Sequence, residues 1–276
     1  MLKAIKQARA AFSLLSPEDI CDRSRRAVRI GLVAASPAGF EAMETFLLPA
    51  GAPNSHVFRA GDPKSPADVD LVLYQKGIDN PSGTYTYDPG DQEGSVAAIL
   101  HGNDDIHLPL ARQYPVFRQQ VVDRLIHAVA RENALFAVAT ALPDIVPNLM
   151  ELPWAFGEWA SDTAFLTINQ IRMAFLIAAA CGREVGLQHQ KGAVVTIGAG
   201  AFGWRALARE LVGKIPFGGG LIPKGAIAYA GTYVVGKGLE RYYYAGRPLT
   251  RGERNGVYQA ALERGRNLLQ GLVKTQ

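Results

Sequence analysis

One stretch of the chain has the residue order in which a phosphate-binding loop would occur. Over residues 28–48, a short apolar run is followed by a turn and by a segment typical of a helix. A P-loop here needs glycines that admit phosphates to the backbone N–H groups, a lysine for the β/γ charge and a hydroxyl for Mg²⁺. The corresponding positions hold Ala34, Gly39, Phe40 and Glu41. Only the second glycine is present, so the stretch predicts a degenerate P-loop that binds no cofactor.

The surrounding residues also disfavour nucleotide hydrolysis. Residues 31–110 contain 3 basic and 11 acidic side chains, a balance that repels phosphate. Residues 91–94, DQEG, match a D-x-x-G switch pattern, but such a short match is common by chance, and no N-K-x-D motif occurs. An alternative hypothesis is a nucleotide-dependent switch or an enzyme that uses a non-standard site within residues 28–110.

One cluster contains residue types that could bind a metal ion. His101, Asp104, Asp105 and His107 supply imidazoles and carboxylates, which suit zinc or another divalent cation. Their spacing matches no established metal motif, and the neighbouring Gly, Asn and Asp residues are ordinary turn formers. We therefore expect a polar surface loop without a metal. No Ser-His-Asp or Cys-His arrangement can be argued, and no G-x-S-x-G motif occurs, so no catalytic residue is predicted.

A glycine-rich apolar tract covers residues 191–238. Single basic residues interrupt it, and its longest uncharged run, residues 192–204, would form a helix of roughly 20 Å. A bilayer core is about 30 Å thick, so this run is too short to cross it. The tract indicates helices that pack closely in a bundle or lie at a membrane surface without spanning it.

Small residues recur four positions apart in this tract, an arrangement that lets helices approach closely. The positions that we expect at helix contacts or at a membrane surface are Ala199, Gly203, Gly218, Gly219, Gly220, Lys224, Ala226, Ala230 and Gly231.

Local patterns place the remaining elements. Apolar and β-branched runs predict strands at residues 28–33, 70–74 and 84–87, and dense Gly, Pro, Asp and Asn predict loops up to residue 110. Helix starts are predicted at Ser16-Pro17, after residue 115, at Ser161-Asp162 and at Thr250, where Glu253 completes capping-box spacing. Gly182 should stop the third of these helices.

These patterns predict a small, degenerate P-loop-like α/β domain followed by a Gly-rich helical bundle. The expected parts are N-terminal helices at residues 1–27, the degenerate P-loop-like α/β domain at 28–112 and a helical, membrane-associating domain at 113–276. Proline at residues 143, 147 and 153 predicts a bent connector within the last part.

The charge distribution bears on partners. Residues 237–276 contain 8 basic and 3 acidic side chains, which suits an anionic lipid surface, although a solvated helical surface is the other interpretation. Tyr242, Tyr243 and Tyr244 lie beside Arg241 and Arg247, as is common at membrane interfaces. Because aromatics are not interleaved with the arginines in a recognisable module, we expect no nucleic-acid partner.

Residues 113–245 resemble the uncharacterised helical domain that follows Era-like GTPase domains in many bacterial proteins and that also forms part of an inner-membrane protein family. The similarity lies in residues 133–137 (NALFA), 142–147, 214–220 (KIPFGGG) and 226–233 (AIAYAGTY). It implies that residues 28–110 are the remnant of a GTPase domain, and it supplies no catalytic residues. It further implies a location at the inner face of a bacterial cytoplasmic membrane. The resulting expectation is a non-catalytic, membrane-associated scaffold or interaction protein with an unknown protein partner.

Overall fold

The computed structural model describes residues 17–49, 56–61, 68–140, 162–193 and 221–274. The chain forms two compact units. The first, here the α/β unit, comprises Asp19–Asp123 with Ala179–Glu184. The second, here the helical unit, comprises Arg124–Ala178 and Val185–Gln276 together with the N-terminal residues. Several predicted features lie outside the described residues: the bent connector, Ala199, Gly203, Gly218, Gly219 and Gly220.

The α/β unit contains a parallel sheet of four strands in the order β2-β1-β3-β4. The strands are β1 (Ile30–Val33), β2 (Val57–Arg59), β3 (Leu71–Gln75) and β4 (Tyr85–Tyr87). The predictions of β1, β3 and β4 are confirmed, whereas β2, only three residues long, was not predicted. Strand β2 pairs with β1 on one side, and β3 pairs with β1 on the other. A topological switch point therefore lies between β1 and β3.

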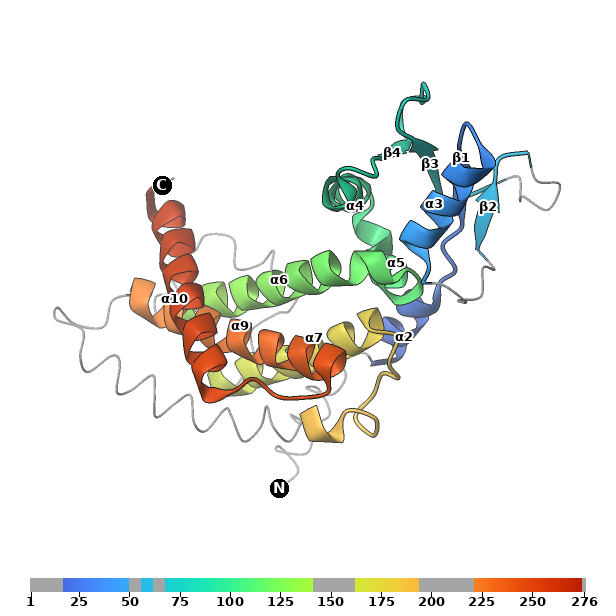
Figure 1. Ribbon diagram of the computed structural model, residues 1–276. Helices are drawn as coiled ribbons and strands as arrows, with labels where there is room; N and C mark the ends of the chain where they lie inside the picture. The colour runs from blue at the N-terminus through green and yellow to red at the C-terminus, as the bar shows by residue number, and fades with distance from the viewer. Residues whose placement is uncertain (1–16, 50–55, 62–67, 141–161, 194–220, 275–276) are drawn as a thin grey trace. The chain divides into compact units, whose positions relative to one another are not determined.

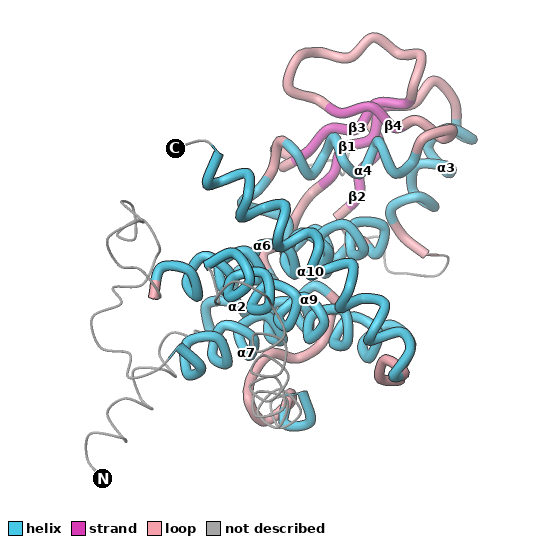
Figure 2. Tube along the Cα trace, turned by 90° about the vertical axis from the view of Figure 1, so that its left-hand side faces the viewer, coloured by secondary structure: helices cyan, strands magenta, loops and turns pink. Residues whose placement is uncertain are grey.

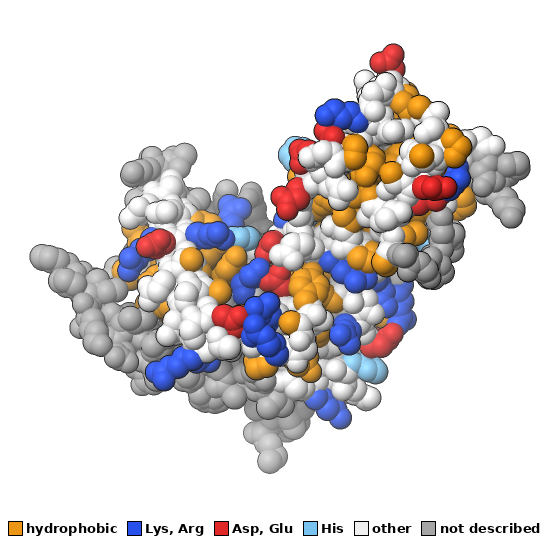
Figure 3. Space-filling view, in the orientation of Figure 1, with side chains coloured by type: hydrophobic (Ala, Val, Ile, Leu, Met, Phe, Trp, Pro, Cys, Tyr) orange, Lys and Arg blue, Asp and Glu red, His pale blue; other side chains and the backbone are white. Residues whose placement is uncertain are grey.

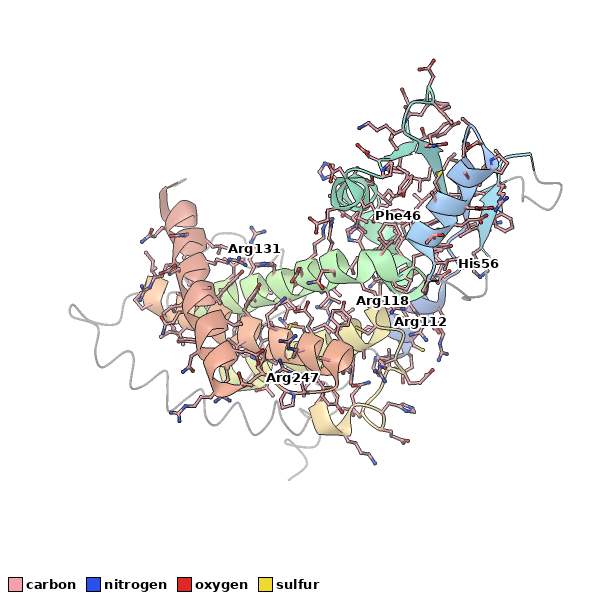
Figure 4. All side chains as sticks on the ribbon, viewed as in Figure 1. Phe46, His56, Arg112, Arg118, Arg131 and Arg247 are labelled. Atoms are coloured by element: carbon pink, nitrogen blue, oxygen red, sulfur yellow. The ribbon has the colours of Figure 1, made fainter. Side chains whose placement is uncertain are left out.

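Alternation of buried side chains explains the central strands. Ile30 and Leu32 of β1 and Leu71 and Leu73 of β3 are each at most 5% exposed. Helix α3 (Pro37–Leu47) lies beside β1 and contributes Phe46, whose ring centroid is 4.9 Å from that of Tyr87 (Figures 1 and 4). The sheet and α3 therefore share one apolar core.

The prediction of loops up to residue 110 is wrong. This segment contains α4 (Gln92–His101), a 3-10 turn (Asp104–Ile106) and α5 (His107–Gln113). The density of Gly, Asp and Asn suggested loops, but these residues lie mainly at helix ends. The apolar residues between them are buried and explain the helices: Val96, Ile99, Leu100, Ile106, Leu108 and Leu110.

The helices predicted to start near Pro17, after residue 115, near Asp162 and at Thr250 are confirmed, whereas the helices predicted within residues 1–16 and 194–220 lie outside the described residues. A 3-10 turn (Pro115–Phe117) leads into α6 (Arg118–Ala139), and α2 (Pro17–Arg25) begins with proline in its first turn. Helix α7 (Asp162–Ala180) is followed by Gly182, which adopts a φ of +72° and donates its N–H to Ala179 O. Helices α9 (Leu221–Ala245) and α10 (Arg251–Lys274) complete the described part of the chain.

The two units differ in secondary structure. Figure 2 shows the strands confined to the α/β unit, while helices dominate the other. The molecule thus combines a small parallel α/β fold with a helical part. Among the described helices, none is both long and apolar enough to cross a membrane.

Candidate functional site

The candidate site is the carboxyl edge of the sheet at the switch point, where open α/β sheets commonly bind ligands. Residues 34–36 connect β1 to α3 at this edge. Ser36 is the N-cap of α3, with an extended backbone (φ −152°, ψ 160°), and Pro37 occupies the first helical position. The Gly39 N–H donates to Ser36 Oγ at 3.2 Å. One of the amides that a phosphate would use at a helix start is therefore bonded to the chain itself.

Gln75, the last residue of β3, extends its side chain from the neighbouring strand to the start of α3. Its Oε1 accepts the Ala35 N–H at 3.2 Å. A Cβ atom added at Gly39 would lie 2.4 Å from Gln75 Oε1 and 3.0 Å from its Cδ. Glycine at position 39 thus allows the close approach of the Gln75 amide, which satisfies a second backbone donor.

The residue at the lysine position of a P-loop, Phe40, contacts a cation instead of supplying one. The Arg59 guanidinium lies over the Phe40 ring, 5.4 Å from its centroid. Arg59 Nε and Nη2 donate to the two carboxylate oxygens of Glu44 at 2.7 and 2.8 Å. Glu41, at the hydroxyl position, is exposed. The arginine beside this helix start is therefore already paired with a carboxylate in bidentate geometry.

Lys76, the residue after Gln75, is also paired. Its Nζ lies 2.5 Å from Asp88 Oδ2, and the Gly90 N–H donates to Asp88 Oδ1 at 2.9 Å. The hydrogen bond to Asp88 raises the pKa of Lys76, and the hydrogen bonds from Lys76 and Gly90 lower the pKa of Asp88. Each group thus stabilises the charged form of the other at the loops after β3 and β4.

The D-x-x-G match is the start of a helix. Asp91 is the N-cap of α4, and its Oδ1 accepts the Gly94 N–H at 2.9 Å. The hydroxyl of Ser95 donates to Asp91 O at 3.0 Å and accepts the Asp88 N–H at 2.9 Å. The pattern is accounted for by capping.

The four candidate metal ligands lie on the helical turns that join α4 to α5. His107 Nε2 lies 2.5 Å from Leu100 O, so this nitrogen carries a proton and donates it to the carbonyl. Asp104 Oδ1 is 3.4 Å from the same nitrogen, while Asp105 pairs with Arg26 at 3.4 Å. In the described ranges, no group of three or more His, Cys, Asp or Glu residues could hold a metal ion.

The helical unit contains a buried polar cluster that was not predicted. Asn133 Nδ2 donates to Thr232 Oγ1 at 2.8 Å, and Asn169 Nδ2 donates to Asn133 Oδ1 at 2.9 Å. Gln170 Nε2 also donates to Thr232 Oγ1, at 3.3 Å. These four side chains are at most 8% exposed and connect α6, α7 and α9. The available signal was a set of polar residues inside otherwise apolar helices, but the sequence did not show which ones would meet.

A second polar group in the same unit connects α6, α9 and α10. His127 Nδ1 lies 2.6 Å from Tyr229 Oη, and His127 Nε2 lies 3.3 Å from Arg264 Nη1. Arginine can only donate, so Nε2 accepts and Nδ1 carries the proton that is shared with Tyr229. Burial raises the pKa of Tyr229. This arrangement places the imidazole between a phenol and a guanidinium.

The predicted packing positions that are described lie on α9. Ala226, Ala230 and Gly231 are buried, while Lys224 is half-buried, with its Nζ 3.5 Å from Thr140 Oγ1. Ala226 meets Gly265 of α10, where an added Cβ would lie 3.1 Å from Ala226 Cα. This is a close contact between two helix backbones.

Comparisons with protein-family models, with curated proteins and with solved structures found no match to this chain.

Proposed function

We propose that the α/β unit is a degenerate, GTPase-like P-loop domain without catalytic function, and that the protein is a membrane-associated scaffold or interaction protein. The observation that carries the first part is the closed start of α3. Ser36 Oγ and Gln75 Oε1 accept the Gly39 and Ala35 amides, the class of donor that binds phosphate in an active P-loop.

A phosphate bound at this helix start would first have to displace these internal hydrogen bonds. Amides at a helix start attract anions because they are unsatisfied. Here the Gly39 amide of the first turn and the Ala35 amide of the preceding loop are both satisfied by uncharged side chains. The nearby cations Arg59 and Lys76 are engaged by Glu44 and Asp88. A phosphate would therefore compete with carboxylates that already occupy both cations.

Isothermal titration calorimetry of the full-length protein with GTP and ATP in the presence of Mg²⁺ tests this part. We expect no micromolar site. A micromolar site that disappears in Gly39→Leu, while persisting in the Gly90→Leu control, would favour the alternative of a nucleotide-dependent switch. Leucine at position 39 would collide with Gln75, whereas at position 90 the nearest atom to an added Cβ is Asp88 Oδ1 at 3.4 Å.

Membrane association is supported by the apolar tract and by the charge of the C-terminal region. Residues 237–276 carry 8 basic and 3 acidic side chains. Attraction between such a region and anionic lipid weakens with salt, whereas burial of apolar surface does not. Attachment at the surface, without a spanning helix, suits a scaffold that meets its partner at the inner face of the membrane.

Co-sedimentation with anionic phospholipid vesicles tests the second part. We expect a sizeable fraction of the protein to pellet, to remain bound at roughly 0.5 M salt, where the Debye length is about 4 Å, and to be released by detergent. Protein that stays in the supernatant at low salt would contradict membrane association.

A further inference from the structure

We propose that residues 241–254 form the docking surface for an anionic phospholipid bilayer. These residues, here the α9–α10 hairpin, comprise the end of α9, the link and the first turn of α10. The inference rests on the proposed membrane association and assigns it to one surface of the helical unit.

Two exposed tyrosines lie at the end of α9. Tyr242 is 54% exposed and Tyr244 is 44% exposed, and across the described part of the chain they are the large hydrophobic side chains with the greatest exposure. Tyr243, between them, is buried and its hydroxyl donates to Gln190 Oε1. The buried ring holds the helix end in place and leaves a phenol on each side of it. Tyrosine rings of this kind favour the headgroup layer, where the ring is partly desolvated and the hydroxyl stays hydrated.

The hairpin is basic. It contains Arg241, Arg247, Arg251 and Arg254 against the single acid Glu253, a formal charge of +3. Arg247 is exposed in the link, where Figure 4 labels it, and Arg251 and Arg254 are exposed on the first turn of α10. In Figure 3, Lys and Arg side chains gather around the segment between α9 and α10, with a carboxylate beside them. This charge is complementary to an anionic surface.

The hairpin is held rigidly before any partner arrives. The Thr250 N–H donates to Glu253 Oε2 at 2.9 Å, and the Glu253 N–H donates to Thr250 Oγ1 at 3.3 Å. Arg241 and Arg247 both donate to Glu253 Oε1, at 2.7 and 2.9 Å. These bonds fix the link and the start of α10, so less conformational entropy is lost there when the surface docks.

The arrangement of the tyrosines favours a bilayer over a nucleic acid. Residues two apart on a helix are separated by about 200° around its axis, because each residue turns it by about 100°. Tyr242 and Tyr244 therefore point to opposite sides of Tyr243 and form no continuous platform for consecutive bases. Both rings can enter a headgroup layer when the end of α9 faces the membrane.

The test is co-sedimentation of the full-length protein with phosphatidylcholine vesicles, with and without phosphatidylserine. The hairpin variants are Arg251→Gln/Arg254→Gln and Tyr242→Ser/Tyr244→Ser. The matched control is Arg131→Gln/Arg266→Gln, which removes the same charge from exposed positions on α6 and α10 outside the hairpin. Thermal melting monitored by circular dichroism verifies that each variant is folded.

We expect the arginine pair to reduce partitioning onto phosphatidylserine vesicles by about 30-fold, from roughly fivefold for each basic side chain at the surface. The double tyrosine substitution should also weaken vesicle binding. Salt should then release the bound variant more easily than the parent protein. The control should change partitioning by less than about twofold, since charges away from the contact are screened.

The outcomes separate this inference from the proposed function. A parent protein that does not bind phosphatidylserine vesicles would overturn membrane association itself. If the parent binds these vesicles and the hairpin variants bind equally well, the hairpin assignment alone is overturned. The same holds if the control variant loses as much binding as the hairpin variants. Binding of a single-stranded oligonucleotide that is lost only in the hairpin variants, with vesicle binding unchanged, would also overturn it.

Discussion

The α/β unit and the helical unit place their polar side chains differently. In the α/β unit, Ile30, Leu32 and Leu73 form an apolar core, and polar groups at the carboxyl edge are satisfied by partners that include near neighbours, as in the Ser36–Gly39 bond. In the helical unit, Asn133 and Thr232 meet in the core from positions 99 residues apart. Both units therefore bury an apolar core, and the helical unit adds close backbone contacts and paired polar groups within it.

The largest expected effect is on the apolar core of the α/β unit. Leu73→Ala should lower the free energy of unfolding of this unit by about 2–5 kcal/mol, because Leu73 is 1% exposed in a central strand. The control, Val72→Ala, alters a half-buried residue of the same strand and should cost less. Hydrogen exchange measures both effects and assigns them to a unit. Equal losses from the two variants would show that the apolar core does not dominate.

A glycine pair on α10 tests the close contacts of the helical unit. A Cβ at Gly265 would lie 3.1 Å from Ala226 Cα and 3.2 Å from Ala226 O, and backbone atoms cannot easily move away. Gly265→Leu should therefore destabilise the unit by about 3 kcal/mol. Gly256 has no atom within 4 Å of such a Cβ, so Gly256→Leu should stabilise α10 by about 0.5–1 kcal/mol through helix propensity. Thermal melts that shift in the same direction for both variants would contradict this difference.

The buried polar cluster gives the next effect. Asn133→Ala removes the partner of both Asn169 and Thr232, and unfolding should become easier by about 2 kcal/mol because buried polar groups lose hydrogen bonds. Asn267, exposed on α10, provides the control Asn267→Ala. Chemical denaturation compares them. Similar midpoints for the parent and Asn133→Ala would indicate that the cluster does not stabilise the helical unit.

A smaller effect is expected at the start of α10. Thr250→Ala removes the hydroxyl that accepts the Glu253 N–H and should cost about 1 kcal/mol, measured as a loss of thermal stability. Ser36→Ala at the start of α3 provides the matching change in the other unit and should cost a similar amount. A loss of stability in only one of the two variants would show that helix capping stabilises one unit and not the other.

The smallest expected effect is on acid stability. Hydrogen bonds from Arg247, the Thr250 amide and Arg241 lower the pKa of Glu253 below its ordinary value of 4.5. Its contribution to stability is therefore complete above about pH 4.5 and is lost as the pH falls below that value. Helical content followed at decreasing pH should fall more steeply, below this point, in the parent than in Glu253→Gln. Parallel acid curves for the two proteins would contradict a role for the ionised carboxylate.

Features that arise from contacts within a few residues could be predicted from residue order. Pro17 begins α2, Gly182 follows the end of α7, and the Thr250–Glu253 capping box starts α10, as their spacing predicts. Apolar runs likewise predicted β1 and β3. Local hydrogen bonding and periodicity are set by residue order, so these elements required no knowledge of the fold. The sequence also showed that positions 40 and 41 hold Phe and Glu, not the lysine and hydroxyl that a P-loop requires.

Contacts between residues far apart in the sequence depend on the fold and could not be predicted from residue order. Gln75 reaches Gly39 because β1 and β3 are adjacent in the sheet, and Asn133 reaches Thr232 because α6 and α9 pack together. Helix α4 formed in a segment rich in turn residues because Val96 and Ile99 are buried there. Neither residue spacing nor composition predicts such contacts, because the free energy of burial depends on surfaces contributed by distant residues.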